Sequence, residues 1–363
     1  MQQELAQKLL SATLNWSDEE IEKYRELLDD FSELKYDQYQ QYKPSSRFVE
    51  NLCIWLNQFL PTERELALNF ILNNLVFISP AEMQHLVNTV YPEIVLPIIE
   101  KQTESLINGI DEEFNSSKDV DMLILRQSLF LAMSDGARID VFRRFSKLDH
   151  DQVCVNYDLS DTKFDEIINE MQKRTKELSE MKALPEKLLS NSFRNVFLLD
   201  DFSGSGVSYL RHENGEWKGK IDKVLKHLEE ERIIQYSSSP GFDNPQIHIV
   251  LYLITEKAHQ ALQKNVADYC KDKNISIFVH YLQKIEKVNL TDEEENWLIK
   301  YYKSDIEDSH YKKGNMDNPH HGFDGCALAL VLYHNTPNNS FPILWSGENA
   351  LFPRVTRHKD VRE

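Results

Sequence analysis

The feature of this sequence that most constrains its fold is a series of short apolar runs, separated by helical stretches, that begins after about residue 115. The runs are residues 128–133, 153–159, 195–201, 246–254, 276–282 and 326–334. They are nearly continuous in apolar residues, which is typical of strands buried on both faces of a parallel sheet. We therefore predict an α/β fold, with a mostly parallel sheet flanked by helices, over residues 116–363.

The first part of the chain has a different pattern of apolar residues. Up to about residue 115 the apolar residues recur at helical spacing, which predicts an all-α domain over residues 1–115. Between residues 48 and 99 this pattern gives three closely connected helices, the second of them continuing to residue 78. Three places have the sequence of a helix N-cap with a glutamate three positions later: Ser17 with Glu20, Thr62 with Glu65, and Ser79 with Glu82. The polar stretch 111–120 predicts the boundary between the two domains.

Closely joined helices also fit a helix-turn-helix or winged-helix DNA-binding domain, with the helix that begins at Pro80 in the groove. That helix has no Lys or Arg before Lys101, although groove binding is usually anchored by cationic contacts to phosphates. The chain has 59 Asp plus Glu against 41 Lys plus Arg, a net charge of -18 that repels a phosphate backbone. We expect a domain that docks a protein, and no direct DNA binding.

Composition limits the remaining classes. At 41% hydrophobic residues, a chain of 363 residues has ample material for packed cores. No apolar run approaches the roughly 18 residues of a membrane helix, and the first residues lack the layout of a signal peptide. The four cysteines are too far apart in sequence for a metal-binding pair or a disulfide framework. We expect a soluble, cytoplasmic protein.

One predicted strand ends in two acids. Residues 196–199 are apolar and lead directly into Asp200 and Asp201. Two adjacent carboxylates at the end of a buried strand are costly unless they bind a metal ion, hydroxyls or hydrogen-bond donors. Ligands of parallel sheets bind at the carboxyl ends of the strands, so this pair is the strongest candidate for chemistry in the sequence.

The loop after the acids consists of small and hydroxyl-bearing residues: Ser203, Gly204, Ser205, Gly206, Val207 and Ser208. Such residues let backbone N–H groups approach a ligand. With a helix N-terminus expected beyond them, they predict a cradle for one phosphate, and a plain strand-to-helix turn is the alternative. The loop is neither a Walker loop, which needs Lys where Val207 stands, nor a dinucleotide loop, which needs glycine where Tyr209 stands.

An apolar strand, two acids and a small-residue loop resemble, in this order, the signature of type I phosphoribosyltransferases. The family's loop ends in Thr-Gly-x-Thr, and residues 205–208 here read Ser-Gly-Val-Ser. The resemblance implies that Asp200 and Asp201 are the catalytic pair that holds the ribose hydroxyls of phosphoribosyl pyrophosphate (PRPP), and that residues 203–208 hold its 5-phosphate. It also implies Mg²⁺, carried by the substrate rather than by a protein cage. Phe202, Ser203 and Gly204 depart from the usual pattern, which leaves open whether catalysis is intact.

A second strand end resembles the same family. Residues 128–133 lead into Ser134, Asp135, Gly136, Ala137 and Arg138, where the family's first core loop holds pyrophosphate. Gly136 permits close backbone approach and Arg138 supplies charge, although a plain turn with a surface arginine fits equally well. The family also has a mobile loop that closes over the reacting centre. The basic segment 173–187 lies in the corresponding interval, with a solvated helix face as the alternative.

The C-terminal part is rich in side chains that recognise hydrogen-bonding groups. His320 and His321 are adjacent, so on a strand they could not face one metal ion, and no Cys or carboxylate completes a set at suitable spacing; we predict no metal held by the protein. The turn 334–339 follows the last predicted strand. In a parallel sheet it would lie at the same edge as the other loops, where Asn335 would help to close the site, unless it is an ordinary Asx-rich turn.

The ending HHGFxxC…HNTPNNxxPILW, together with residues 198–206 and the helical front, resembles the phosphoribosyltransferase-like proteins of bacterial conflict and anti-phage systems. Some of these are encoded beside retron reverse transcriptases. The resemblance implies an effector that acts on PRPP or a nucleotide at the anomeric carbon of ribose. Two alternatives remain: a PRPP or nucleotide sensor that does not catalyse, and a docking component of a retron-type ribonucleoprotein with a reverse transcriptase and nucleic acid.

Overall fold

The computed structural model describes residues 3–108, 117–155, 161–230, 234, 244–307 and 311–355. Most of the stretch 111–120, where we expected a domain boundary, lies outside the described residues, as do the last residues of the strand expected over 153–159. The chain divides into two compact units. Unit 1 is formed by Met1–Met83 and Glu286–Glu363, and unit 2 by Gln84–Ile285. This division differs from the one expected at residue 115, because residues 286–363, which follow unit 2 in the sequence, pack with the N-terminal helices.

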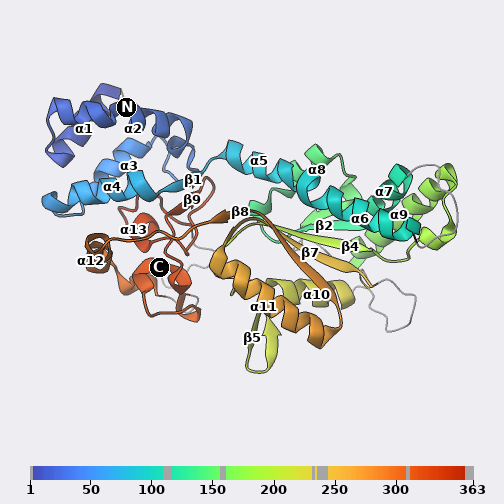
Figure 1. Cartoon of the computed structure of the whole chain (residues 1–363). Helices are drawn as coiled ribbons and strands as arrows, with labels where there is room; N and C mark the ends of the chain where they lie inside the picture. Colours follow the sequence, from blue (N-terminus) through green and yellow to red (C-terminus); the bar gives the residue numbers. More distant parts are fainter. Residues whose placement is uncertain are drawn as a thin grey trace. The chain divides into compact units, whose positions relative to one another are not determined.

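Unit 2 contains a five-stranded sheet in which every neighbouring pair is parallel (Figure 1). Its order is β3-β2-β4-β7-β8. The strands are β2 (Ser128–Ala132), β3 (Val153–Val155), β4 (Asn195–Ser203), β7 (Gln246–Thr255) and β8 (Ser276–Ile285). These strands fall in five of the six predicted runs, and the predicted α/β fold with a mostly parallel sheet flanked by helices is confirmed.

Helices cover both faces of this sheet, which explains why its strands are apolar throughout. One face buries a core shared with α9 (Asp161–Lys182), α10 (Lys220–Glu230) and α11 (Glu256–Lys273). On the other face, four rings lie in register across four strands: Phe130, Phe197, His248 and Phe278. Phe130 also contacts Phe142 of α8 (Ile139–Ser146), which packs on that face.

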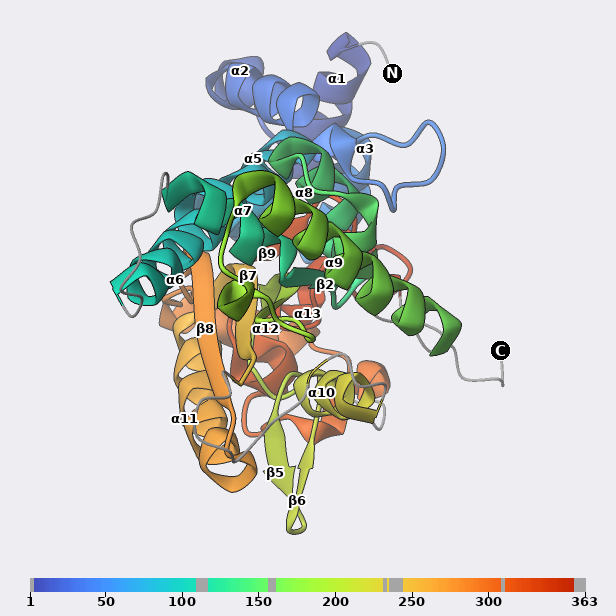
Figure 2. The same cartoon turned by 90° about the vertical axis from the view of Figure 1, so that its right-hand side faces the viewer.

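The remaining elements of unit 2 are α6 (Leu96–Asn108), α7 (Ser117–Arg126) and a hairpin of β5 (Arg211–Glu213) and β6 (Glu216–Lys218). Figure 2 shows the hairpin extending away from the sheet beyond α10. Before α6, the helix α5 (Pro80–Val90) passes through a π-helical turn, Tyr91–Val95. None of the helices that the structure describes is both long and apolar enough to cross a membrane.

Unit 1 joins the two ends of the chain. Its elements are α1 (Gln3–Leu14), α2 (Asp18–Leu34), α3 (Phe48–Leu56), α4 (Arg64–Asn74), β1 (Val76–Ile78), α12 (Asp292–Tyr301), β9 (Leu330–Leu332) and α13 (Pro342–Trp345). β1 pairs with β9 in parallel, and the indole N–H of Trp55 donates to the Ile343 carbonyl at 2.8 Å. The strand expected over 326–334 is therefore short and belongs to unit 1, and the prediction that it joins the large sheet is wrong. Its apolar residues are buried in unit 1 instead.

The structure shows which of the three predicted helix N-caps form. Ser17 and Glu20 form a reciprocal capping box, and so do Ser79 and Glu82, whose two hydrogen bonds measure 2.8 and 3.2 Å. The cap predicted at Thr62 is wrong, because a 3₁₀ turn, Pro61–Glu63, leads into α4 without any side-chain cap. The helix expected to continue to residue 78 ends at Asn74, and residues 76–78 form β1 because they pair with β9.

Candidate functional site

The two acids predicted from the sequence lie at the carboxyl end of β4, beside the point where the strand order of the sheet reverses. From β2 the chain goes to β3 on one side, and β4, β7 and β8 follow on the other side. The loops after β2 and β4 therefore diverge, and such a switch point is where open α/β sheets bind their ligands. This position makes Asp200 and Asp201 candidates for ligand binding.

Asp200 is completely buried, and its carboxylate accepts hydrogen bonds from three side chains. The hydroxyl of Tyr209 donates to its Oδ2 at 2.6 Å, and the ammonium group of Lys220 donates to the same oxygen at 2.7 Å. The hydroxyl of Ser134, in the loop after β2, donates to Oδ1. A buried carboxylate is stable only when it is paired and hydrogen-bonded, and these three donors meet that requirement. Asp200 thus joins the loops after β2 and β4.

Lys220 is the functional candidate that the sequence analysis missed. It is the first residue of α10, and its ammonium group also lies 4.8 Å from the centre of the Tyr209 ring. Gly219 before it has a φ of +129°, and a Cβ there would lie 2.3 Å from the Tyr209 carbonyl oxygen. A side chain at residue 219 is therefore excluded. The signal in the sequence is a glycine-lysine pair directly before an amphipathic helix, shortly after the acid pair.

Asp201 has different surroundings from Asp200. Its side chain is half-buried, and its Oδ1 accepts the Phe202 N–H at 2.8 Å. Asp200, by contrast, is completely buried and forms an ion pair with Lys220. The two adjacent acids are therefore unequal: Asp200 is enclosed within the protein, and Asp201 is the more accessible carboxylate.

The loop 203–208 is compact. Residues 203–206 are buried, Val207 is half-buried and Ser208 is exposed. Gly206 has a φ of +75°, and a Cβ there would lie 3.2 Å from the Ala258 carbonyl oxygen of α11, so only glycine fits without strain. The loop turns back on itself, since the Tyr209 N–H donates to the Gly206 carbonyl at 3.0 Å. Ser208 and Val207 form its accessible end.

The donors of this loop are largely unused. Within the described part of the chain, the backbone N–H groups of Ser205, Gly206 and Ser208 donate to no protein acceptor, and the buried hydroxyl of Ser203 has no partner. The Val207 N–H makes one long bond, 3.4 Å, to the Ser205 hydroxyl. Buried backbone donors are nearly always paired, so a row of unpaired N–H groups is what an anion-binding loop provides.

The helix N-terminus expected beyond this loop is present, but it does not follow the loop directly. The hairpin β5–β6 follows the loop, and α10 begins only at Lys220. The N-terminus of α10 nevertheless returns to the loop, because the Lys220 N–H donates to the Ser208 carbonyl at 3.0 Å. The hairpin is thus an insertion between the loop and the helix that would otherwise follow it.

Thr255, at the end of β7, is a second residue that the sequence analysis missed. Its hydroxyl donates to the Gly204 carbonyl and accepts the Ala258 N–H at 3.0 Å, which caps the N-terminus of α11. One side chain therefore fixes both the loop and the neighbouring helix. A threonine directly before a helical pattern is a recognisable N-cap in the sequence, but its contact with the loop depends on the pairing of β4 with β7.

Two hydrogen bonds fix the loop after β2 beside the acid pair. Ser134 is buried and bonded to Asp200, and the hydroxyl of Tyr252 donates to the Ala137 carbonyl. Burial raises the pKa of Tyr252 well above its usual value, and the nearby carboxylates of Asp200 and Asp201 add to this shift. The Ser134 hydroxyl supports the acid, which differs from the expectation that it contacts ligand.

The other residues of this loop border the site. Gly136 is buried and Asp135 is exposed. Arg138 is half-exposed and adopts a left-handed conformation, φ 47°, at the start of α8, with its Nε 4.0 Å from an oxygen of Asp140. The 3₁₀ turn Asp135–Ala137 places these residues between β2 and α8. Their role in binding pyrophosphate stays a prediction.

Two further segments lie away from the positions that were expected. The basic segment 173–187 belongs mainly to α9, which ends at Lys182, and to the 3₁₀ turn Glu186–Leu188, so it is a helix face rather than an open loop. Asn335 belongs to unit 1, where its amide oxygen accepts the Thr336 and Val355 N–H groups at 3.0 and 3.1 Å. Its expected position at the edge of the large sheet assumed a strand that pairs with β1 instead.

Comparison with known proteins agrees with this geometry. A search of curated proteins found no match, and a search of solved structures found none either. A family model described as PRTase-CE matches residues 52–354, which include both the acid pair and the loop 203–208. The chain therefore belongs to the PRTase-CE family, a family of the phosphoribosyltransferase type.

Proposed function

We propose that this protein binds PRPP or a nucleotide at the carboxyl end of β4 and breaks the bond at the anomeric carbon of the ribose. The observation that carries the proposal is the unequal acid pair beside a loop of unpaired N–H groups. Asp200 is buried and paired with Lys220, and Asp201, the more exposed of the two carboxylates, is the one that would accept hydrogen bonds from the ribose hydroxyls. Membership of a phosphoribosyltransferase-type family supports the same reading.

The phosphate of the substrate would bind at the accessible end of the loop 203–208. Its charge suits the unpaired N–H groups and the N-terminus of α10, which lies at Ser208. Arg138 and the backbone at Gly136 would face the pyrophosphate. Mg²⁺ would enter as part of the substrate, the magnesium complex of PRPP, because both oxygens of Asp200 already accept hydrogen bonds from protein side chains.

In this reaction the bond between C1 of the ribose and the pyrophosphate oxygen breaks, and the electron pair leaves with pyrophosphate. A nucleophilic atom of the acceptor forms the new bond to C1 and gives up its proton to solvent or a base. The transition state resembles a sugar cation, so a fixed carboxylate near the ring stabilises it, and cations stabilise the leaving pyrophosphate. Lys220 contributes by keeping Asp200 in place rather than by touching the sugar.

The direct test measures pyrophosphate release from PRPP and Mg²⁺ with a panel of bases, nucleotides and nucleic acids as acceptors. Release by the wild-type protein, reduced at least tenfold in Asp201→Asn, supports the proposal. The matched control is Asp268→Asn, which neutralises an exposed carboxylate on α11 of the same unit and is expected to leave the rate unchanged. Equal release from the wild type and Asp201→Asn contradicts the assignment of the catalytic pair.

A second function deserves a test because Asp200 is engaged inside the protein. The resemblance gave both acids to the ribose hydroxyls, and of the two only Asp201 is partly exposed. A site of this kind can bind PRPP or a nucleotide without turning it over, as a sensor does. Calorimetric binding of PRPP with no release of pyrophosphate, under any acceptor, would favour the sensor over the enzyme.

We further propose that the protein acts in the cytoplasm as an effector of bacterial anti-phage defence, alone or docked to a retron-type complex of reverse transcriptase and nucleic acid. This rests on the resemblance of its C-terminal part and its helical front to proteins of such systems. The test compares phage plating on cells that express the whole locus with either the wild-type gene or Asp201→Asn. Protection by the wild type alone supports a catalytic effector, and co-purification of a reverse transcriptase supports the docking role.

A further inference from the structure

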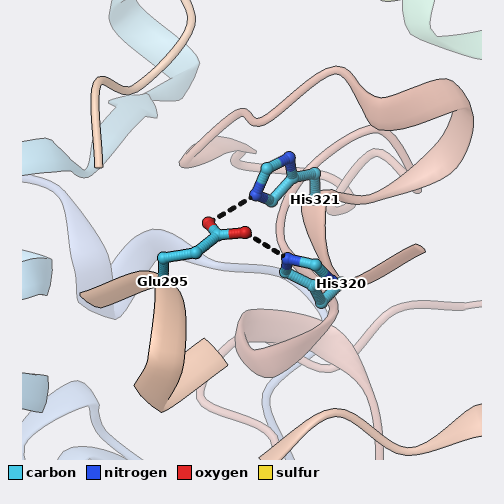
Figure 3. Close-up of side chains that lie close together, drawn as sticks. All are labelled: Glu295, His320 and His321. Carbon is cyan, nitrogen blue, oxygen red and sulfur yellow. Dashed lines mark hydrogen bonds and ion pairs between the residues drawn. The ribbon is translucent and has the colours of Figure 1, made fainter. Parts of the chain in front are cut away.

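Three side chains from two separate parts of the sequence meet in unit 1 (Figure 3). Nε2 of His320 lies 2.7 Å from Oε1 of Glu295, and Nε2 of His321 lies 2.7 Å from Oε2 of the same carboxylate. The ligand atoms of the three residues all lie within 4.8 Å of one another. The fold thus brings two imidazoles and one carboxylate to a single point.

The adjacent histidines converge because they lie in a turn and not on a strand. Pro319–His321 form a 3₁₀ helical turn, in which consecutive side chains are about 120° apart, whereas side chains that alternate along a strand point to opposite faces. The centres of the two rings are 4.4 Å apart, at an angle of 65°. The reason for excluding a metal site from the sequence therefore does not apply, and Glu295 supplies the carboxylate that was missing.

The turn is held rigidly from several sides. The His321 carbonyl accepts the Ala327 N–H at 2.8 Å, the Pro319 carbonyl accepts the Tyr311 hydroxyl at 2.8 Å, and the Phe323 N–H donates to the Asn338 carbonyl at 2.7 Å. Gly322 has a φ of +85°, and a Cβ there would lie 2.5 Å from the Asn339 carbonyl oxygen. A turn fixed in this way presents its two histidines in one arrangement.

The carboxylate comes from an equally fixed element. Glu295 lies in the first turn of α12, whose N-terminus has a capping box between Thr291 and Glu294. Further along this helix, Trp297 is buried against the rings of Trp55, Phe59 and Phe70, and Lys300 and Tyr301 both bind Glu63 at the start of α4. The donor atoms are therefore positioned before any ligand arrives, as a metal site of useful affinity requires.

The donor set itself has a chemical preference. Two imidazole nitrogens and one carboxylate suit borderline divalent transition metals, and in zinc enzymes a His₂Glu set leaves one position open for water. In the hydrogen-bonded arrangement each Nε2 carries a hydrogen, because a carboxylate only accepts. Metal binding would place that ring hydrogen on Nδ1 instead and free the Nε2 lone pair for the ion. The partial exposure of the three side chains, 10%, 18% and 32%, leaves access for an ion.

We propose that Glu295, His320 and His321 bind one divalent transition metal ion, for which Zn²⁺ is the probe, with at least one coordination position left for water or an external ligand. The site lies in unit 1 and is separate from the acid pair of unit 2, so it does not depend on the function proposed above. It gives the C-terminal segment a chemical role of its own.

The test uses the purified full-length protein, treated with a chelator and dialysed. Zn²⁺ is then titrated by calorimetry, and the bound metal is counted by elemental analysis. We expect one ion per chain. Glu295→Gln and His321→Gln are each expected to weaken binding by roughly 100-fold or more, since loss of outer-shell partners alone costs about 10- to 100-fold. Glu293→Gln, an exposed carboxylate on the same helix, and His85→Gln, an exposed histidine, are the matched controls and should bind as the wild type does.

A measurement on the wild type keeps the test decisive if a variant fails to fold, which circular dichroism would reveal. The X-ray absorption spectrum of the zinc-loaded protein should show nitrogen and oxygen ligands with the scattering pattern of two imidazoles. Sulfur ligands, no saturable zinc binding in the wild type, or unchanged affinity in a folded Glu295→Gln variant would each overturn the proposal.

Discussion

The ammonium group of Lys220, the first residue of α10, lies 2.7 Å from a carboxylate oxygen of the completely buried Asp200. The lysine side chain is 29% exposed, so the pair extends from the sheet edge toward solvent. This contact fixes the start of α10 relative to β4 and neutralises one of two adjacent acids. It explains how the sheet edge tolerates both carboxylates, and it makes the pair the natural target for mutation.

Removing the Lys220 ammonium group should leave the buried Asp200 carboxylate without its cation and so lower the stability of the fold. We expect Lys220→Met to lower the free energy of unfolding by about 1–3 kcal/mol, below the 3–5 kcal/mol of a fully buried pair because Lys220 is partly exposed. Chemical denaturation measures this change. Lys223→Met, an exposed lysine on the same helix, is the control and should change stability little. The double variant with Asp200→Asn should recover part of the loss, and strictly additive effects would contradict a direct interaction.

The two acids should respond differently to the same substitution. Asp200→Asn removes the negative charge and one of the two oxygens that accept from three side-chain donors, so we expect a loss of about 1–3 kcal/mol in unfolding free energy together with weaker PRPP binding. Asp201→Asn should leave the unfolding free energy within about 0.5 kcal/mol and act on PRPP binding or turnover. Denaturation and calorimetry, made on both variants, separate the two effects. A larger loss of stability in Asp201→Asn than in Asp200→Asn would show that the roles are reversed.

Gly206→Ala should damage the loop by two separable effects. The left-handed backbone alone costs a residue with a Cβ about 1–2 kcal/mol, and the contact with the Ala258 carbonyl adds to this. Gly215→Ala is a matched control, because Gly215 has a φ of +82° with no atom within 4 Å of an added Cβ. We expect a larger loss of thermal stability for Gly206→Ala, and weaker PRPP binding in that variant only. Equal losses would show that α11 yields to the added methyl group.

The row of rings on the sheet makes stability depend on pH. Burial lowers the pKa of His248 to about 3, with a smaller contribution from His280, which lies 3.1 Å away between ring nitrogens. Below the ordinary histidine pKa of about 6.5 the unfolded chain binds a proton that the folded protein does not. The unfolding free energy should therefore have its highest value above about pH 6.5. It should fall by up to about 1.4 kcal/mol per pH unit as the pH is lowered toward 3.

Urea denaturation as a function of pH measures this slope. His248→Phe, which keeps a ring between Phe197 and Phe278, should flatten the slope by about one proton, because its side chain does not titrate. His85→Gln removes an exposed histidine and should leave the slope as it is. A wild-type slope that persists unchanged in His248→Phe would assign the pH dependence to other groups.

The sheet of unit 2 was predictable because a strand buried on both faces must be apolar along its whole length. Residues 326–334 show the limit of that argument. They are apolar because unit 1 buries them, and burial does not specify a pairing partner. The division into two units depends on contacts between the two ends of the chain. The local pattern of apolar residues does not show which distant segments are in contact, so it could not predict this division.

Some residues of the candidate site could be predicted from the sequence, and others could not. Asp200, Asp201 and the loop 203–208 follow one strand directly, so their neighbourhood is fixed by local sequence. Lys220 reaches Asp200 only because a hairpin lets α10 return to the loop, and Thr255 reaches Gly204 only through the pairing of β4 with β7. Glu295 and His321 meet through a turn and a helix whose contacts are equally long in range. Such convergence is set by packing, which no local pattern records.

The discontinuous composition of unit 1 has a consequence for biosynthesis. On the ribosome the whole of unit 2 emerges before β9 does, so β1 has no strand to pair with until residues 330–332 have been made. The parallel sheet can meanwhile condense on its own contacts, whereas the N-terminal helices must wait with apolar surface uncovered. Any chain that stops short of β9 leaves that surface open, and is exposed to chaperones and proteases for this reason.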